Sequence, residues 1–280
     1  MMANRPLNPA ELHAVLEWYR AAGVDVAVGD EPVDRFAASL RQKPQPKDAA
    51  PGLARPAVAA PAPAVPMAPM QVPLIGGDPR EAEALANAAD SLDALKAAMA
   101  GFDGCSLKAR ATQLVFADGN PDAGIMLIGE APGSEEDKIG KPFVGRAGQL
   151  LDRMLGAIGL DRNKVFIANM VPWRPPGNRN PTPEELAVCL PFLHRMVALA
   201  APRVVVTLGN VPTQALFETS VGITRIRGQW KELTLGGHSV RAMATLHPAF
   251  LLRTPSAKRQ AWQDLLSVRE ALQKENLLPG

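Results

Sequence analysis

Four short apolar segments, each followed by a loop rich in Gly, Pro, Asn or His, constrain the fold of this chain more than any other feature. The segments are GIMLIG, KVFIAN, RVVVTLG and VRAMATL, at residues 124–129, 164–169, 203–209 and 240–246. Their apolar character is typical of strands that are buried on both faces of a sheet. Helical patterns separate or follow them, at residues 147–158, 183–200, 211–218 and 257–273. This alternation predicts an α/β fold with a mainly parallel sheet and helices on both sides.

The part of the chain before these segments has a different composition. Residues 9–22 (PAELHAVLEWYRAA) have the apolar spacing of a short amphipathic helix. The following stretch is rich in proline and alanine, and proline at this density removes amide donors and stiffens the chain. We therefore predict an N-terminal helical extension at 1–42, a flexible Pro/Ala-rich linker at 43–80 and a folded domain at 81–280. Recruitment of a proline-binding partner is the alternative to a spacer.

The charge is distributed unevenly along the chain. Residues 1–100 contain nine basic and 12 acidic side chains, whereas residues 101–280 contain 21 and 16. The second part is therefore the one suited to a polyanion, although a solubilising surface would explain the same excess. No apolar run approaches the length of a membrane span, and residues 1–12 lack a secretory pattern. With two distant cysteines and no disulfide framework, we expect a cytoplasmic protein that does not contact a membrane.

In a parallel sheet the functional loops gather at the carboxyl ends of the strands. The first such loop contains Gly129, Pro132 and Gly133, which predict a tight connection into a helix. By itself this pattern fits either a phosphate-binding loop or a plain turn. It is not a P-loop, because no Gly-Lys-Ser/Thr sequence follows.

Polar and aromatic residues occupy the other strand-end loops. His247 directly follows an apolar strand, Asn169 stands at the end of its own strand, and Phe143 lies in a loop flanked by Gly and Pro. An amide offers a donor and an acceptor together, which suits the edge of a base. An amide that caps a turn and a structural histidine are equally compatible with these positions.

Several basic residues lie in or just beyond the same loops. Their charges suit contacts to phosphate groups, and a solvated surface is the alternative for each of them. These candidate DNA-binding residues are Arg174, Arg179, Arg253, Lys258 and Arg259.

Taken together, the loop sequences resemble those of the family-4 uracil-DNA glycosylases, the iron–sulfur type. The resemblance is carried, in order, by GEAPGSEED, GKPFVGRAGQLLDRML, an asparagine-ended strand before RPPGNRNPTPEE, LGN and HPAFLLR. It extends from about Cys105 to the end of the chain. It implies a three-layer α/β/α sandwich with a central four-stranded, mainly parallel sheet. It also implies a DNA repair hydrolase that cleaves the N-glycosidic bond of uracil and needs no diffusible cofactor.

The resemblance also implies roles for particular residues. Phe143 is similar to the aromatic residue that stacks on the flipped uracil, and Asn169 to the amide that reads its edge. His247 is similar to the histidine that donates a hydrogen bond to uracil O2 as the bond breaks. Gly129 and Ala131 would complete the pocket. These side chains are expected to converge around one flat pyrimidine.

Glu130 is our candidate for orienting the attacking water. Better-known uracil glycosylases use an aspartate in this loop, but here the residue after Glu130 is Ala131. This departure is shared with family 4. It leaves Glu130 or Asn169 as the water-orienting group, and we favour Glu130.

Only two of the four cysteines that bind the family's four-iron cluster are present in this sequence. Cys105 and Cys189 resemble two of the four cysteines, whereas Phe102 and Trp173 stand at the other two positions. Neither aromatic side chain ligates iron, and a cluster ordinarily requires four thiolates. We predict no metal and no cofactor, and expect the two remaining thiols to lie close together, reduced and half-buried.

The main hypothesis is therefore a monomeric enzyme whose partner is uracil-containing DNA. A non-catalytic or weakly catalytic DNA-binding relative is the second hypothesis, in which loss of the cluster ended activity. A nucleotide-binding enzyme that uses residues 129–133 on phosphates is the third.

Overall fold

The computed structural model describes His13 and residues 77–278. The predictions for residues 1–42 and 43–76 therefore lie outside the described residues, apart from His13, which is an exposed residue in a helix. Residues 77–278 belong to one compact unit. No helix in the described part of the chain has the length and apolar character that crossing a membrane requires.

A mixed sheet of six strands forms the centre of this unit, in the order β1-β3-β2-β4-β6-β5. The four predicted strands pair in parallel at its centre, which confirms the predicted α/β class. The predicted number of strands was too low, because an antiparallel strand was missed at each edge. In sheet order, the strands are Asp118–Gly119, Phe166–Asn169, Ile125–Gly129, Val204–Leu208, His238–Thr245 and Trp230–Leu235.

The central strands are buried on both faces, as their sequences predicted. In β2, Met126 and Ile128 face one hydrophobic cluster, whereas Ile125 and Leu127 face another on the opposite side. Alternate residues of a strand point to opposite faces, so a strand between two cores must be apolar throughout. This explains the nearly continuous apolar runs in the sequence.

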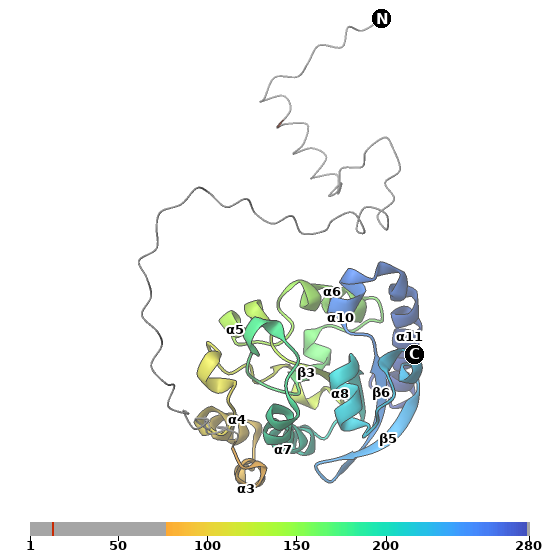
Figure 1. Ribbon diagram of the computed structural model, residues 1–280. Helices are drawn as coiled ribbons and strands as arrows, with labels where there is room; N and C mark the ends of the chain where they lie inside the picture. Colours follow the sequence, from red (N-terminus) through yellow and green to blue (C-terminus); the bar gives the residue numbers. More distant parts are fainter. Residues whose placement is uncertain (1–12, 14–76, 279–280) are drawn as a thin grey trace, which may run out of the picture. The chain divides into compact units, whose positions relative to one another are not determined.

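Helices cover both faces and give three layers (Figure 1). The first cluster packs against α3 (Pro79–Ala88), α4 (Leu92–Gly101), α7 (Pro183–Ala200) and α8 (Asn210–Leu216). The second packs against α6 (Arg146–Gly156), α10 (Pro248–Arg253) and α11 (Lys258–Lys274). Two short helices, α5 (Ser134–Ile139) and α9 (Ile223–Ile226), lie in the connections.

The helix boundaries follow recognisable capping residues. Helix α7 has the predicted bounds because Thr182 and Glu185 form a capping box and Pro183 occupies its first turn. Helix α3 starts at Pro79, where the Asp78 carboxylate accepts a hydrogen bond from the amide of Arg80 at 3.0 Å. Helix α3 thus begins two residues before residue 81.

Candidate active site

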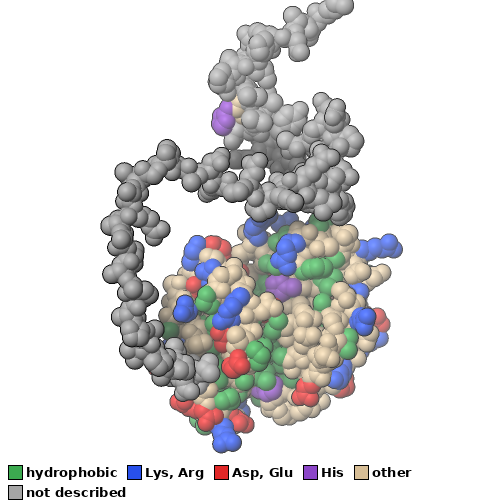
Figure 2. Space-filling view, in the orientation of Figure 1, with side chains coloured by type: hydrophobic (Ala, Val, Ile, Leu, Met, Phe, Trp, Pro, Cys, Tyr) green, Lys and Arg blue, Asp and Glu red, His purple; other side chains and the backbone are tan. Residues whose placement is uncertain are grey.

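The carboxyl ends of β2, β3, β4 and β6 surround one pocket of about 670 Å³. Its walls come from all four strand-end loops and from the start of α9. In the space-filling view, several Lys and Arg side chains surround apolar side chains on the face where α5, α8 and α10 lie (Figure 2). Topology alone therefore brings loops that are far apart in sequence to one edge of the sheet.

Gly129 is the point where β2 and β3 bring two functional side chains together. It pairs in register with Asn169, the last residue of β3. A Cβ atom at Gly129 would lie 2.5 Å from Asn169 Oδ1 and 2.6 Å from Phe143 Cε2 and Cζ. No side chain fits there, so glycine allows the amide and the aromatic ring to approach the strand directly.

Asn169 carries an unused hydrogen-bonding group. The residue is 7% exposed, and within the described part of the chain its Oδ1 is buried without a hydrogen-bond partner. A buried polar atom without a partner costs about 1–3 kcal/mol, so such atoms call for an explanation. Because Asn169 lines the pocket, a donor group of a ligand would satisfy it.

Phe143 lines the same pocket in an uncommon backbone conformation. Its φ angle is +54°, in the left-handed region that aromatic residues rarely adopt. Its ring centroid lies 5.5 Å from that of the His247 ring, and the two planes are inclined by 31°. Such a conformation costs of order 1–3 kcal/mol, so the surrounding contacts must maintain it.

His247 is held in one orientation by the helix that follows it. It is the N-cap of α10, and its Nδ1 accepts a hydrogen bond from the amide of Ala249 at 3.1 Å. In the neutral ring the proton then resides on Nε2, which is left as a donor. Burial, and to a lesser extent the charge of Arg253, lowers the pKa of His247 to about 4, against the opposing effect of Glu136. The ring is therefore a neutral donor at physiological pH.

Glu130 and Ala131 line the pocket directly after β2. Glu130 is half-buried, and burial raises the pKa of its carboxyl group above the ordinary value. A carboxylate with a raised pKa is a better proton acceptor than one on the surface. The predicted catalytic residues Glu130, Asn169 and His247 thus share one pocket with Phe143.

Two of the predicted DNA-binding residues lie at the pocket, Arg179 and Arg253. Arg253 is exposed at the end of α10. Arg179 is already engaged, because its Nη1 and Nη2 donate to the two carboxylate oxygens of Glu185 at 2.8 and 2.6 Å. Only part of its guanidinium group is available to a phosphate.

The other three predicted DNA-binding residues do not line the pocket. Arg174 is half-buried and donates through Nε to Asn178 Oδ1 at 2.8 Å. Lys258 lies at the start of α11 beside a separate apolar groove, and the neighbouring Arg259 is exposed. Position in a strand-end loop therefore did not place these side chains at the pocket.

Glu136 is a pocket residue that the sequence reasoning missed. Its Oε2 accepts from the amide of Gly133 at 3.1 Å, and its Oε1 accepts from Val144 and Gly145 at 3.0 and 2.9 Å. One buried carboxylate thus joins the loop after β2 to the loop that carries Phe143. A Glu three residues after a helix N-cap is the available sequence signal, and it lies within GEAPGSEED.

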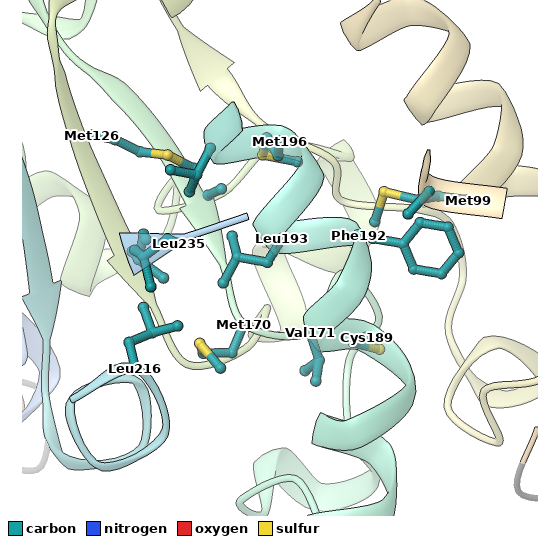
Figure 3. Close-up of a cluster of buried hydrophobic side chains, with 14 of the residues drawn as sticks. Met99, Met126, Met170, Val171, Cys189, Phe192, Leu193, Met196, Leu216 and Leu235 are labelled. Carbon is teal, nitrogen blue, oxygen red and sulfur yellow. The ribbon is translucent and has the colours of Figure 1, made fainter. Parts of the chain in front are cut away.

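The two cysteines lie together in the core rather than at the pocket. Their Sγ atoms are 3.8 Å apart, and both residues are fully buried, at 2% and 1% exposure for Cys105 and Cys189. The prediction that they are half-buried was therefore wrong. Figure 3 shows Cys189 and Phe192 on α7, with the Phe192 ring near Met99 of α4.

The side chains around these thiols do not fit a four-iron cluster. Phe102 and Trp173 are buried in the same hydrophobic cluster as the cysteines, and the Phe102 ring centroid lies 5.2 Å from that of Phe192. Among residues 77–278, no group of three or more His, Cys, Asp or Glu side chains is arranged to hold a metal ion. The chain has only two of the four thiolates that such a cluster ordinarily requires.

Comparison with known proteins agrees with this site. The family model of the uracil DNA glycosylase superfamily matches residues 116–266, which include all four strand-end loops. The chain is 39% identical over 186 residues to a type-4 uracil-DNA glycosylase of Sulfurisphaera tokodaii, covering 65% of this chain and 84% of that relative. It is 41% identical over 177 residues to a type-4 uracil-DNA glycosylase of Thermotoga maritima, covering 61% and 89%. A type-5 uracil-DNA glycosylase of Pyrobaculum aerophilum is 30% identical over 146 residues, covering 47% and 63%.

The protonation state of His247 is directly testable. NMR of protein labelled with ¹⁵N-histidine is expected to show His247 neutral, with the proton on Nε2, from pH 8 to below pH 5.5. Since the folded pKa lies below the ordinary value, the ring protonates only as pH falls towards about 4. The His247→Gln variant assigns the signal. A titration midpoint near 6.5 would contradict the burial argument.

Proposed function

This chain belongs to the uracil-DNA glycosylase superfamily, and on that premise we propose that it removes uracil from DNA by hydrolysis and leaves an abasic site. The observation that carries the proposal is the convergence of Phe143, Asn169 and His247 at one pocket. They supply an aromatic face, an amide whose oxygen has no partner among the residues that the structure describes, and a neutral hydrogen-bond donor. This set suits a flat pyrimidine that has been turned out of the DNA helix.

Uracil is recognised by the shape of the pocket and by the Asn169 amide. The Phe143 ring stacks on the base. Gly129, which does not itself line the pocket, leaves room for that ring and for the Asn169 amide, while Ala131 lines the pocket beside the edge of the base. The Asn169 oxygen accepts from uracil N3–H, and its NH₂ group donates to O4. Cytosine presents the opposite pattern at these two positions, so its binding would leave buried groups unpaired.

His247 stabilises the leaving group. As the bond between C1′ of the sugar and N1 of uracil breaks, the electron pair moves into the base and negative charge grows on O2. Nε2–H of the neutral His247 ring donates to this oxygen. A donor of this kind typically contributes about 10²–10³ in rate.

Glu130 directs the water that completes the reaction. The water oxygen forms a bond to C1′ of the electron-poor sugar, and the Glu130 carboxylate accepts the proton that is released. Burial raises the pKa of Glu130, which brings this acceptor closer to the pH at which the enzyme works.

Basic side chains hold the DNA around the pocket. Arg253, an exposed cation that lines the pocket at the end of α10, would contact a phosphate near the flipped nucleotide. Arg179 also lines the pocket, whereas Arg174, Lys258 and Arg259 would contact the backbone further away. We further propose that the protein acts as a monomer in the cytoplasm.

The enzyme works without an iron–sulfur cluster. Phe102, Trp173 and the two buried thiols form a hydrophobic core in the region that the family's cluster would use. No step of the proposed reaction passes through a metal ion.

An oligonucleotide assay tests the proposed function. The wild-type protein is expected to make a uracil-containing strand alkali-labile and to leave the matching thymine strand intact. Glu130→Gln keeps the size of the side chain but cannot accept the proton, so the single-turnover rate should fall by about 10²–10⁴. A gel shift on the uracil strand without any cleavage by the wild type would contradict the proposal in favour of a binding protein.

Asn169→Asp tests the reading of the base. A carboxylate cannot donate to uracil O4, so we expect the preference for uracil over cytosine to fall by about 10- to 100-fold. Excision rates on paired uracil and cytosine substrates measure it. Asn163→Asp, at an exposed position, is the matched control. Unchanged selectivity in Asn169→Asp would remove this residue from recognition.

The metal content tests the absence of a cluster. Protein purified without oxygen is expected to contain no stoichiometric iron and to show no visible iron–sulfur band. Because no cluster supports the fold, uracil excision should also survive incubation with a chelator. A brown protein with stoichiometric iron would overturn this part of the proposal.

A further inference from the structure

The loop that carries Phe143 is held on both sides by charged side chains. On one side, the Glu136 carboxylate accepts the amides of Val144 and Gly145 at 3.0 and 2.9 Å. On the other, Arg162 donates to backbone carbonyl oxygens, through Nη1 to Pro142 at 3.2 Å and through Nη2 to Phe143. Consecutive backbone groups around the aromatic residue are thus fixed by an anion and a cation.

Two carboxylate groups hold the Arg162 side chain in place. Its Nη1 donates to Asp118 Oδ2 at 2.7 Å, and its Nε donates to Asp152 Oδ1 at 2.9 Å. The first carboxylate also pairs with Lys141, whose Nζ lies 3.1 Å from Asp118 Oδ1. With two edges of the planar guanidinium group held by carboxylates, its remaining N–H groups point at the loop.

The carbonyl of Phe143 depends on this contact. Helix α6 packs closely against it, since a Cβ at Gly148 would lie only 1.7 Å from Phe143 O. Water therefore has little room on that side, and Phe143 as a whole is 5% exposed. Without Arg162, a buried acceptor would lose its partner in a residue whose backbone is already strained at φ +54°.

We propose that Arg162 is a positioning residue for base recognition, acting through the backbone of Phe143 to hold the stacking ring in the pocket. The proposal rests on the proposed function for its effect on uracil, but not for its effect on the loop. Arg162 itself does not line the pocket, so it does not touch the base. An ion pair with Asp118 and Asp152 that served stability alone would not need the two carbonyl contacts.

A double-mutant cycle tests this route of action. Arg162→Gln should weaken binding of a strand containing 2′-fluoro-2′-deoxyuridine, an analogue resistant to hydrolysis, by about tenfold. Phe143→Ala should also weaken binding, and adding Arg162→Gln to it should cause no further loss. If Arg162→Gln weakened binding of the analogue as much in Phe143→Ala as in the wild type, the proposal would be overturned. Arg153→Gln, at an exposed arginine of α6, is the matched control and should bind as the wild type does.

A lysine at position 162 provides a second test of the proposal. Arg162→Lys keeps the positive charge but has no planar fork to reach two carboxylates and two carbonyls together. It should therefore bind the analogue as weakly as Arg162→Gln does. Full rescue by lysine would mean that charge alone matters, and would overturn the proposed geometry.

Hydrogen exchange tests the hold on the loop without any reference to catalysis. In Arg162→Gln the amides of Val144 and Gly145 should exchange faster, while those of β2 and β4 keep their protection. Unchanged exchange in this loop would overturn the proposal. If instead the wild type removes no uracil yet the loop loosens in the variant, the proposed function fails and the positioning role of Arg162 stands.

Discussion

The close contact of three residues at the end of β2 is the constraint on which the site depends. Gly129 has no side chain, and the space where one would stand is taken by the Asn169 amide and the Phe143 ring. The amides of Met170 and Val171 also donate to the carbonyls of Gly129 and Glu130, so the two strand ends continue to pair beyond the sheet. The position of the Asn169 amide is thereby fixed by the same hydrogen bonds that fix the register of the sheet. Such sites on rigid strands are more precise than sites carried by loops alone.

The sequence was informative wherever burial dictates composition. The four central strands were predicted because both of their faces are buried, and α7 from its helical pattern, whose start coincides with a capping box. The two edge strands were not predicted, for opposite reasons. Strand β1 has two residues and therefore no period, whereas β5 (Trp230–Leu235) is largely exposed and reads as a polar segment. Helices α5 and α10, of six residues each, are too short for a helical period to be recognised.

The site residues also fall into two groups, those that the sequence identified and those that it did not. Side chains at or just after the end of a strand, such as Asn169 and His247, were identifiable because topology fixes where strand ends lie. Arg162 was not, since it acts on a backbone carbonyl 19 residues away and no local pattern records such a contact. For Glu136 the sequence signals only the helix start, not the contacts to Val144 and Gly145 in the next loop. Some of the basic residues show the opposite error, because they were predicted at the site but lie elsewhere in the structure. Lys258 was judged by its nearness to a loop in sequence, but it lies beside a different groove.

The electrostatics of the pocket favour a neutral histidine over a charged one. Burial is the largest cause of the low pKa of His247, and Arg253 adds to it. DNA would oppose the second cause by placing a phosphate beside Arg253, but it would strengthen the first by excluding water from the pocket. Because burial is the larger cause, we expect the ring to stay neutral when a base fills the pocket. A neutral donor costs less to bury than a cation, and in a pocket without water it still stabilises an oxygen that gains negative charge. Burial also raises the pKa of Glu130, so in the proposed reaction one physical cause would favour both the neutral donor and the proton acceptor.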